Sequence, residues 1–485
     1  MDNLSVKKRV KLIYPPSPLF QRGEDRCQIN VESSAANSLR ACNDLGYISA
    51  ILKRDGYSVI IKDYQAEKKQ FSDLICDVKK ENPDVVFIST ANGCIHQDLQ
   101  VVSTLKSINP NLVIVMKSAL FFNCEKSLFE NIDFIDVDYL VGGEIEFIIS
   151  DLIDAHYNDK EKLKIIEGIS YKINDEWITN NLINFNEDLD LLPFPDRKEI
   201  KNELYINPET NRPMALITTS KGCCFSCKYC LSPIISGKKI RERSVESIFA
   251  EIEECVNEHN IVDFFFKADT FSTNKKSVMQ LCEMLIEKGY NKKINWVSTT
   301  RVDAVDDEML KTMKKAGCSL VAMGFESGSN ESLKKMGKNT TVEKNLEAAK
   351  LCKKNGLKIL GHFLIGFPWE TTEHLKEVKK HIFDVDADYI EISILVPYIG
   401  TPIHDEYLER VGSDINVFGS DSFGNVFKNF AQLSAEQLQK FRKNTLIRFY
   451  LRPKYIFKKL MSVRSVGTFS NYIKYGFRML KNSLF

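Results

Sequence analysis

Short apolar runs alternate with amphipathic segments along the first third of the chain. The amphipathic segments repeat apolar residues every three or four positions, which is the spacing of one helix face, whereas the runs have strand length. The predicted strands are 10–14, 57–61, 85–88, 112–116 and 139–141. The predicted helices are 43–54, 71–80, 98–108, 125–130 and 146–155. Strands that alternate with helices predict a parallel sheet covered on both faces. Residues 1–155 are therefore expected to form a doubly wound, Rossmann-like α/β domain.

This alternation is interrupted and then resumes. Residues 156–205 hold a hairpin pattern with Asn174 and Asp175 at its turn, followed by an acidic linker with two prolines. Six further apolar runs are 215–219, 262–267, 294–298, 320–323, 359–364 and 389–396, and a helical pattern follows each of the first five. Six such units predict a (β/α)6 partial TIM barrel over residues 206–400, with its chemistry on the loops after the strands. Residues 401–485 are expected to form a helical C-terminal extension.

The composition is close to the globular average, with 44% apolar and 27% charged residues, which excludes wholesale disorder. The net charge of +1 hides an uneven distribution. Residues 437–485 contain twelve Lys or Arg and no Asp or Glu, which leaves −11 for residues 1–436. This tail is also rich in aromatic residues. A basic, aromatic helical segment can lie on an anionic membrane surface or pack against the barrel. Nucleic-acid binding is the least favoured interpretation of the tail.

The sequence shows no apolar leader at its start and no run of about 18 apolar residues, so we expect a cytoplasmic protein, with peripheral contact to the membrane inner face through the tail. In a reducing compartment, most of the 13 cysteines are expected to be small buried apolar residues.

Three cysteines depart from that expectation. Cys223, Cys227 and Cys230 form a C-x3-C-x2-C pattern directly after the first predicted barrel strand. Thiolates suit iron–sulfur clusters or zinc, and three of them can hold three corners of one cluster. A closed structural zinc site needs a fourth ligand. Cys224 abuts Cys223, so the two side chains diverge. The pattern therefore indicates a cluster with one open iron, and structural zinc is the alternative.

The segment KGCCFSCKYC resembles the signature of radical S-adenosylmethionine (SAM) enzymes. The resemblance implies that the three cysteines hold a [4Fe–4S] cluster whose open iron chelates SAM. An electron from the cluster then yields methionine and a 5′-deoxyadenosyl radical, which abstracts hydrogen from an unactivated carbon.

Later barrel segments resemble the family's motifs in the same order: FKADTFSTN (266–274), TTRVDAVDDEML (299–310), MGFESGSNESLKKMGK (323–338) and GHFLIGFPWET (361–371). The SAM-binding residues implied by the resemblance are Tyr229, Asp269, Arg301, Glu326, Ser327 and Gly366. Two alternatives stay open, because Asp269 also suits a helix cap and Glu326 also suits a salt bridge in the barrel mouth.

Residues 1–200 resemble the cobalamin-binding domain fused to many such enzymes, most closely the branch of the anaerobic magnesium-protoporphyrin cyclase and the hopanoid methylases. The segments that carry this resemblance are 12–17, 45–59, 82–90, 138–146 and 189–197. The cobalamin contacts that the resemblance implies are Ser89, Thr90, Lys117, Ser118, Gly143 and Glu144.

DYQAEK (63–68) has no His ligand, which the resemblance to the radical branch implies for its cobalamin. One departure weighs against cobalamin, because Lys117 and Ser118 stand where a glycine pair would admit the buried nucleotide tail. The alternative is a degenerate domain that shapes the substrate entrance.

The resemblance implies cobalamin-dependent C-methylation, with an external electron donor such as flavodoxin or ferredoxin. The basic, aromatic tail adds the hypothesis of a lipid or other hydrophobic substrate. One alternative is a cobalamin-independent radical enzyme that performs C–C coupling, cyclisation or sulfur chemistry. Another is a non-catalytic iron–sulfur or zinc scaffold. A tRNA-modifying methylthiotransferase is disfavoured, because the N-terminal cysteines at 27, 42, 76, 94 and 124 are scattered.

Overall fold

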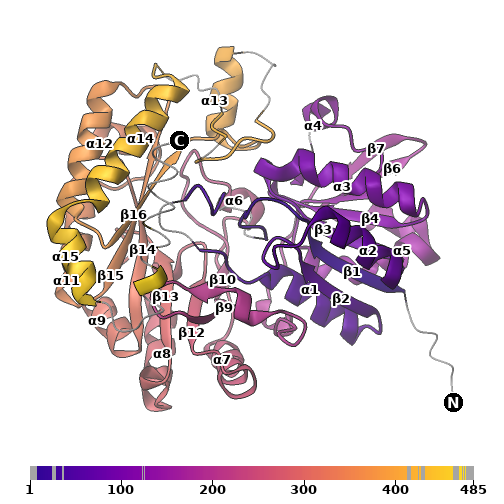
Figure 1. Cartoon of the computed structure of the whole chain (residues 1–485), viewed down its shortest axis with the longest axis horizontal. Helices are drawn as coiled ribbons and strands as arrows, with labels where there is room; N and C mark the ends of the chain where they lie inside the picture. Colours follow the sequence, from indigo (N-terminus) through magenta and orange to yellow (C-terminus); the bar gives the residue numbers. More distant parts are fainter. Residues whose placement is uncertain are drawn as a thin grey trace.

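A seven-stranded sheet lies at the centre of each of two domains in the computed structural model (Figure 1). The structure describes residues 8–462 except 24–28, 35–37, 123, 125, 412–416, 424 and 428–431, together with 469–471, 473 and 476. Two domains of α/β type agree with the predicted fold class.

The N-terminal sheet has the strand order β2-β1-β3-β4-β5-β6-β7, and its first five strands are parallel. Its strands are β1 Arg9–Tyr14, β2 Ser58–Asp63, β3 Val85–Ser89, β4 Val113–Lys117, β5 Tyr139–Val141, β6 Ile169–Ile173 and β7 Glu176–Asn180. The helices are α1 Asn43–Arg54, α2 Phe71–Glu81, α3 Ile95–Ile108, α4 Lys126–Asn131 and α5 Ile149–Asn158. Every residue of β3, β4 and β5 is buried, as the continuous apolar runs predict for strands covered on both faces.

The predicted hairpin extends this sheet. Strands β6 and β7 pair antiparallel with each other, and β6 pairs with β5. Asn174 and Asp175 adopt φ values of 50° and 65°, as a two-residue turn of type I′ requires. The sequence predicted the hairpin, but it did not predict that the hairpin pairs with β5.

The second sheet has the order β16-β15-β14-β13-β12-β9-β8, and its six long strands are parallel. Its strands are β8 Ile206–Asn207, β9 Arg212–Thr218, β12 Asp263–Lys267, β13 Asn295–Thr300, β14 Cys318–Glu326, β15 Lys358–Ile365 and β16 Tyr389–Ile394. The outer helices are α7 Val245–His259, α8 Lys275–Glu287, α9 Asp307–Lys315, α11 Val342–Lys354 and α12 Thr372–Val385. The sheet is a curled half-barrel, as predicted (Figure 1).

The two faces of the half-barrel have different neighbours. Ile217, Phe266 and Met323 point outward into the core beneath the helices. Met214 and Phe265, which alternate with them along the strands, point inward and join the core shared with the N-terminal domain. The inner face is therefore covered partly by the other domain rather than by barrel helices.

The C-terminal region contains α13 Pro402–Val411, α14 Ala435–Tyr450 and α15 Pro453–Ser462. Leu438, Leu446 and Phe449 of α14 belong to the barrel core, so α14 packs against the barrel. Helix α15 leaves Phe457 and Met461 66% and 74% exposed. Contact of α15 with a membrane surface stays a prediction. None of the helices in the described part of the chain has the length and apolar character needed to cross a membrane.

Candidate active site

The cysteine motif occupies the loop that follows β9 and the short strand β10 (Ser220–Lys221). The loop begins at Gly222, which has φ +97° and whose missing Cβ leaves room for the carbonyl oxygen of Lys239. The Cys223 amide donates to the Gly237 carbonyl at 2.9 Å, and the Cys230 amide donates to the Cys227 carbonyl at 3.2 Å. These contacts fold the loop back on itself at the carboxyl end of the barrel.

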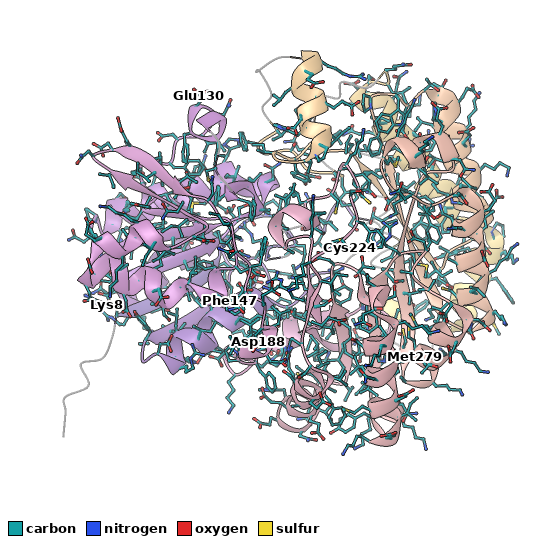
Figure 2. The ribbon with its side chains drawn as sticks, turned by 180° about the vertical axis from the view of Figure 1, so that it is seen from behind. Lys8, Glu130, Phe147, Asp188, Cys224 and Met279 are labelled. Carbon is teal, nitrogen blue, oxygen red and sulfur yellow. The ribbon has the colours of Figure 1, made fainter. Side chains whose placement is uncertain are left out.

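The three cysteines of the motif lie deeper than the extra one. Cys223 is buried, Cys227 and Cys230 are half-buried, and Cys224 is exposed. Figure 2 shows Cys224 in the middle of the molecule, between the barrel helices and the N-terminal domain. Burial, and after it the charges of Asp269 and Cys227, raise the pKa of the Cys223 thiol. Burial and the other two thiols of the motif raise the pKa of Cys230 to about 11. Metal binding must therefore displace protons from these thiols.

Arg301, at the end of β13, supplies a fixed positive charge to this loop. Its Nη1 lies 3.5 Å from the sulfur of Cys227, and its guanidinium stacks 3.7 Å from the ring centroid of Phe225. Two bonds of 2.8 Å to the Asp303 carboxylate and one of 2.7 Å to the Lys338 carbonyl fix its orientation. A cation beside a sulfur favours the thiolate, which is the form that binds metal.

The donor set fits a [4Fe–4S] cluster, because three thiols converge on one loop next to a cation. Among the described residues, no three His, Cys, Asp or Glu side chains have the spacing that a single metal ion requires. A cluster separates its thiolates by several irons and sulfides, so it does not need that spacing.

Asp269, after β12, supports the cysteine loop. Its Oδ2 accepts the Gly222 amide at 2.8 Å. The N-cap of the following helix α8 is Asn274, so the helix-cap alternative for Asp269 does not hold. Asp269 instead positions the residue directly before Cys223.

Glu326 ends β14 in a left-handed conformation, with φ +59°. A non-glycine residue in this region costs about 1–3 kcal/mol and persists where its neighbours hold it. Lys338 Nζ lies 2.7 Å from Glu326 Oε1, so the salt bridge expected as one alternative is present. Burial, followed by the nearby Glu326 carboxylate, raises the pKa of Tyr229 well above its usual range. Two predicted SAM-binding residues therefore lie close to each other.

Gly366 follows β15 and also requires a left-handed backbone, with φ +98°. Its amide donates to Glu370 Oε2 at 2.6 Å, and the Phe367 amide donates to the same oxygen at 3.1 Å. The Phe367 ring packs edge-to-face on Tyr229 with 5.8 Å between centroids. Ser327 is buried, and its Oγ accepts the Ser329 amide at 3.2 Å, so it shapes the turn after β14.

The comparisons with known proteins agree with this geometry. Residues 217–382 match the model of the radical SAM superfamily. An uncharacterized methyltransferase of Pyrococcus horikoshii is 31% identical over 418 residues, which cover 86% of this chain and 89% of that protein. The chain belongs to the radical SAM superfamily.

Other radical SAM proteins place the chain within the superfamily. The anaerobic magnesium-protoporphyrin IX monomethyl ester cyclase of Cereibacter sphaeroides is 28% identical over 377 residues, which cover 76% of this chain and 60% of the cyclase. Among solved structures, the cobalamin-dependent radical enzyme OxsB has a TM-score of 0.69 at 18% identity and covers 98% of this chain and 72% of its own. The radical SAM methyltransferase TsrM of Kitasatospora setae has a TM-score of 0.65 at 17% identity and covers 83% and 76%. These two show a shared fold.

Glu370 is a residue of the radical SAM site that the sequence analysis missed. It is fully buried, its Oε1 has no hydrogen-bond partner among the described residues, and burial raises its pKa to about 7. The sequence offers one weak signal for this role. An acidic residue stands four positions after Gly366, where its carboxylate can accept the amides of Gly366 and Phe367.

Replacing Glu370 by Gln is expected to make stability less sensitive to pH. The carboxyl of the unfolded chain ionises near its usual pKa of about 4.3, whereas the folded pKa is about 7. Between these values the folded state binds more protons, so the free energy of unfolding falls as pH rises. Glu370→Gln should therefore gain about 2 kcal/mol relative to wild type between pH 5 and pH 8 in urea unfolding. Glu373→Gln, at an exposed position, is the control, and parallel curves for Glu370→Gln and wild type would contradict the prediction.

A buried ion pair occupies part of the carboxyl edge of the N-terminal sheet. Arg22 and Asp98 form a fully buried ion pair with N–O distances of 2.6 and 3.0 Å. Arg22 Nη1 also donates to the carbonyl of Ser89 at 2.9 Å, and the Thr90 hydroxyl donates to Asp98. Two of the predicted cobalamin contacts, Ser89 and Thr90, therefore form hydrogen bonds with an internal ion pair.

The other four predicted cobalamin contacts lie at or near a small interdomain cavity of about 80 Å³, lined by Lys117, Gly143 and Glu144 among others. Glu144 pairs with Arg241 at 2.8 Å and with Lys221 at 3.3 Å, which ties the N-terminal domain to the barrel. Ser118 is buried beside it and caps a short turn by accepting the Leu120 amide at 3.3 Å. Ligand pockets for drug-sized molecules hold about 300–1,000 Å³, and a corrinoid is larger than such molecules. The residues around this small cavity do not fit cobalamin, but a separate cavity of about 710 Å³ lies beyond the ends of β1 and β2, lined by Ser17, Tyr64 and Gln65 among others.

Proposed function

We propose that this radical SAM enzyme abstracts hydrogen from an unactivated carbon of an apolar substrate held inside the half-barrel. The observation that carries the proposal is the meeting of the cysteine loop, Arg301, Glu326 and Gly366 at the carboxyl ends of the strands, above an apolar inner face. When a cluster and SAM are bound there, they supply the 5′-deoxyadenosyl radical.

The residues of this site have separable roles in the proposal. Cys223, Cys227 and Cys230 hold the cluster, while Arg301 places a positive charge 3.5 Å from the sulfur of Cys227. Glu326 and the Tyr229 hydroxyl present polar groups to the nucleoside of SAM, since a carboxylate accepts bonds from ribose hydroxyls. Gly366, held by Glu370, lets its backbone approach the adenine. Burial of these groups excludes water that would otherwise compete for their hydrogen bonds.

The fate of the substrate radical distinguishes two candidate reactions. The small cavity at the predicted cobalamin contacts favours a reaction that does not use cobalamin, such as C–C coupling, cyclisation or sulfur chemistry, with the N-terminal domain as a wall of the substrate space. Cobalamin-dependent C-methylation is the second candidate, favoured by the methyltransferase relative and by the likeness to TsrM and OxsB. We derive no step through a corrinoid.

Hydroxocobalamin is expected not to bind the purified full-length protein. Entry would expose or displace a buried ion pair, and breaking such a pair costs about 3–5 kcal/mol. The measurement is the visible spectrum after incubation and gel filtration, with anaerobic reconstitution of the cluster as the control for native protein. One equivalent of retained cobalamin would overturn this prediction and favour methylation. The radical proposal itself is tested separately, by formation of 5′-deoxyadenosine from SAM after reduction with dithionite.

A further inference from the structure

The loop that follows β5 of the N-terminal domain carries two carboxylates to the barrel. These belong to Glu144 and Glu146, whose side chains are 9% and 12% exposed. The loop is held on its own domain, because the Gly142 amide donates to the Gly168 carbonyl at 3.1 Å and the Phe147 amide donates to the Glu144 carbonyl at 3.0 Å. Figure 2 shows Phe147 on the side of the N-terminal domain that faces the barrel. Both carboxylates therefore start from a fixed backbone.

Their partners stand at the two stems of the cysteine loop. Strand β10 pairs antiparallel with β11 (Arg241–Glu242), and this pairing places Lys221 directly opposite Arg241. The cysteine loop, residues 222–240, leaves the first of these strands and returns to the second. Like charges directly opposite each other destabilise a strand pair. The two stems therefore need a counter-charge between them.

Glu144 supplies this counter-charge. It accepts two bonds from the Arg241 guanidinium, at 2.8 and 2.9 Å, and Lys221 Nζ lies 3.3 Å from its Oε1. Glu146 binds the same Lys221 ammonium group. Burial alone would raise the pKa of Glu146, but the charges of Lys221 and Lys117 lower it to about 2. The N-terminal domain is thus joined to both stems by charge-assisted bonds, which are stronger than neutral ones.

From the stems, the contacts continue to the first cysteine of the motif. Lys221 stands two positions before Cys223. Arg241 Nη2 donates to the carbonyl of Ser236 at 2.9 Å, and the next carbonyl, of Gly237, accepts the Cys223 amide at 2.9 Å. A shift of either stem would therefore move the backbone that places Cys223.

We propose that Glu144 and Glu146 are positioning residues, through which the N-terminal domain sets the geometry and the charge around the cluster-binding loop. Glu144 acts on both stems and Glu146 on one, so Glu144 has the larger effect. This role of the N-terminal domain needs no corrinoid. The inference rests on the proposed function, because the loop is the one that holds the cluster of the same radical site.

Hydrogen exchange of the full-length apoprotein, read by mass spectrometry, tests the effect on geometry. Glu144→Gln keeps the size of the side chain and removes the carboxylate that pairs with Arg241. Amides of residues 222–240 should exchange about tenfold faster than in wild type, because the bonds of the loop open more often. Glu146→Gln should give a smaller increase, since Lys221 keeps Glu144. Unchanged exchange in Glu144→Gln would overturn the inference.

The midpoint potential of the reconstituted cluster tests the effect on charge. Net charge and hydrogen bonding around a cluster set its potential, so loss of the Glu144 charge should make the potential less negative. SAM cleavage should fall about tenfold, at the low end of the loss that follows removal of a metal ligand's supporting partner. Glu144→Asp keeps the charge and should stay close to wild type in potential. A potential in Glu144→Asp that equals that of Glu144→Gln would show that the charge has no part in the role.

Glu187→Gln is the matched control. Glu187 pairs with Lys239 of the same loop, but the two side chains are 62% and 72% exposed, and exposed pairs contribute little. The variant should match wild type in exchange, in potential and in SAM cleavage. Effects equal to those of Glu144→Gln would overturn the assignment. If circular dichroism shows that Glu144→Gln does not fold, Glu146→Gln carries the same readouts and should lie between Glu187→Gln and a free loop.

The two proposals fail in different ways. If wild-type protein cleaves SAM but Glu144→Gln leaves loop exchange and cluster potential unchanged, only the positioning inference is wrong. If Glu144→Gln changes both but wild-type protein never cleaves SAM, the proposed radical function is wrong.

Discussion

Cys227→Ala is expected to reduce the formation of 5′-deoxyadenosine to background. Cys227 is one of three thiols on the loop, and it is the sulfur that Arg301 contacts at 3.5 Å. Loss of a hydrogen-bond partner of a metal ligand alone costs about 10–100-fold in affinity or activity, so loss of a ligand itself should cost more. The measurement is product formation from SAM under anaerobic conditions with dithionite, together with iron and sulfide content.

Cys224→Ala is the matched control for this prediction. Cys224 adjoins Cys223 but is exposed and stands outside the C-x3-C-x2-C pattern. The variant should keep iron content and SAM cleavage close to wild type. Full activity in Cys227→Ala would show that the assignment of the three cysteines as cluster ligands is wrong. An intact cluster that never cleaves SAM, in wild type and with candidate substrates present, would support the non-catalytic scaffold instead.

The sequence was most informative where local pattern decides structure. Apolar runs and helical periodicity predicted both sheets, because each strand buries its own residues regardless of what lies farther along the chain. The cysteine spacing predicted the loop chemistry for the same reason. Gly366 has φ +98°, while its close approach to the adenine stays a prediction.

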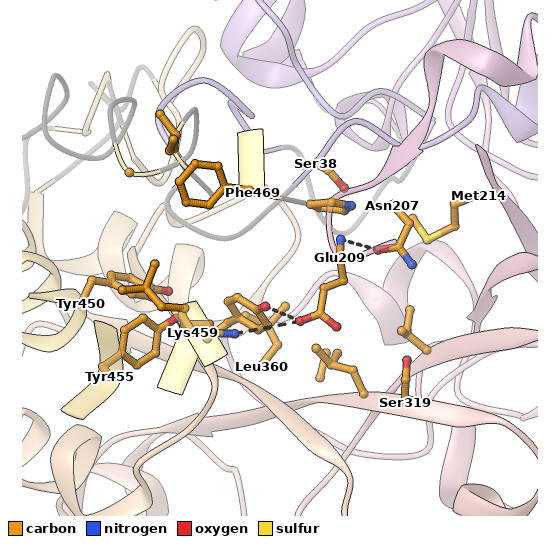
Figure 3. Close-up of a pocket in the computed structure, with 18 of the residues that line it drawn as sticks. Ser38, Asn207, Glu209, Met214, Ser319, Leu360, Tyr450, Tyr455, Lys459 and Phe469 are labelled. Carbon is orange, nitrogen blue, oxygen red and sulfur yellow. Dashed lines mark hydrogen bonds and ion pairs between the residues drawn. The ribbon is translucent and has the colours of Figure 1, made fainter. Parts of the chain in front are cut away.

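Contacts between distant residues could not be predicted in this way. The Arg22–Asp98 pair joins residues 76 positions apart, and neither neighbouring sequence shows that the other is near. The contact of Asp269 with the amide of Gly222 spans 47 positions and could not be predicted; the role of Asp269 as a SAM contact stays a prediction. A cavity inside the half-barrel is lined both by barrel strands and by residues of α15 such as Leu460, which lie far apart in the sequence (Figure 3). Such features depend on how the elements pack, so they cannot be predicted from periodicity or motif spacing.

The largest expected loss of stability comes from a single carboxylate, Glu251 of α7. It is fully buried and pairs with two guanidinium groups, with Arg197 at 2.6 Å and with Arg243. Arg197 also donates to the Leu216 carbonyl at 2.9 Å, and Arg243 donates to the Thr218 carbonyl at 3.0 Å. These carbonyls belong to the end of β9, which leads into the cysteine loop. One carboxylate therefore pairs with two guanidinium groups, and these two groups hold the end of the strand that leads into the cysteine loop.

Glu251→Ala should lower the free energy of unfolding by at least about 3–5 kcal/mol, because it leaves two buried cations without a counter-charge. The same change should reduce iron incorporation, since the end of β9 loses its support. Urea unfolding followed by circular dichroism measures the first effect, and iron content after reconstitution measures the second. Glu246→Ala, on the exposed face of the same helix, is the control and should stay within about 1 kcal/mol of wild type. If the urea unfolding midpoint of Glu251→Ala matches that of this control, then hydration, rather than the pairing with Glu251, stabilises the charges of Arg197 and Arg243.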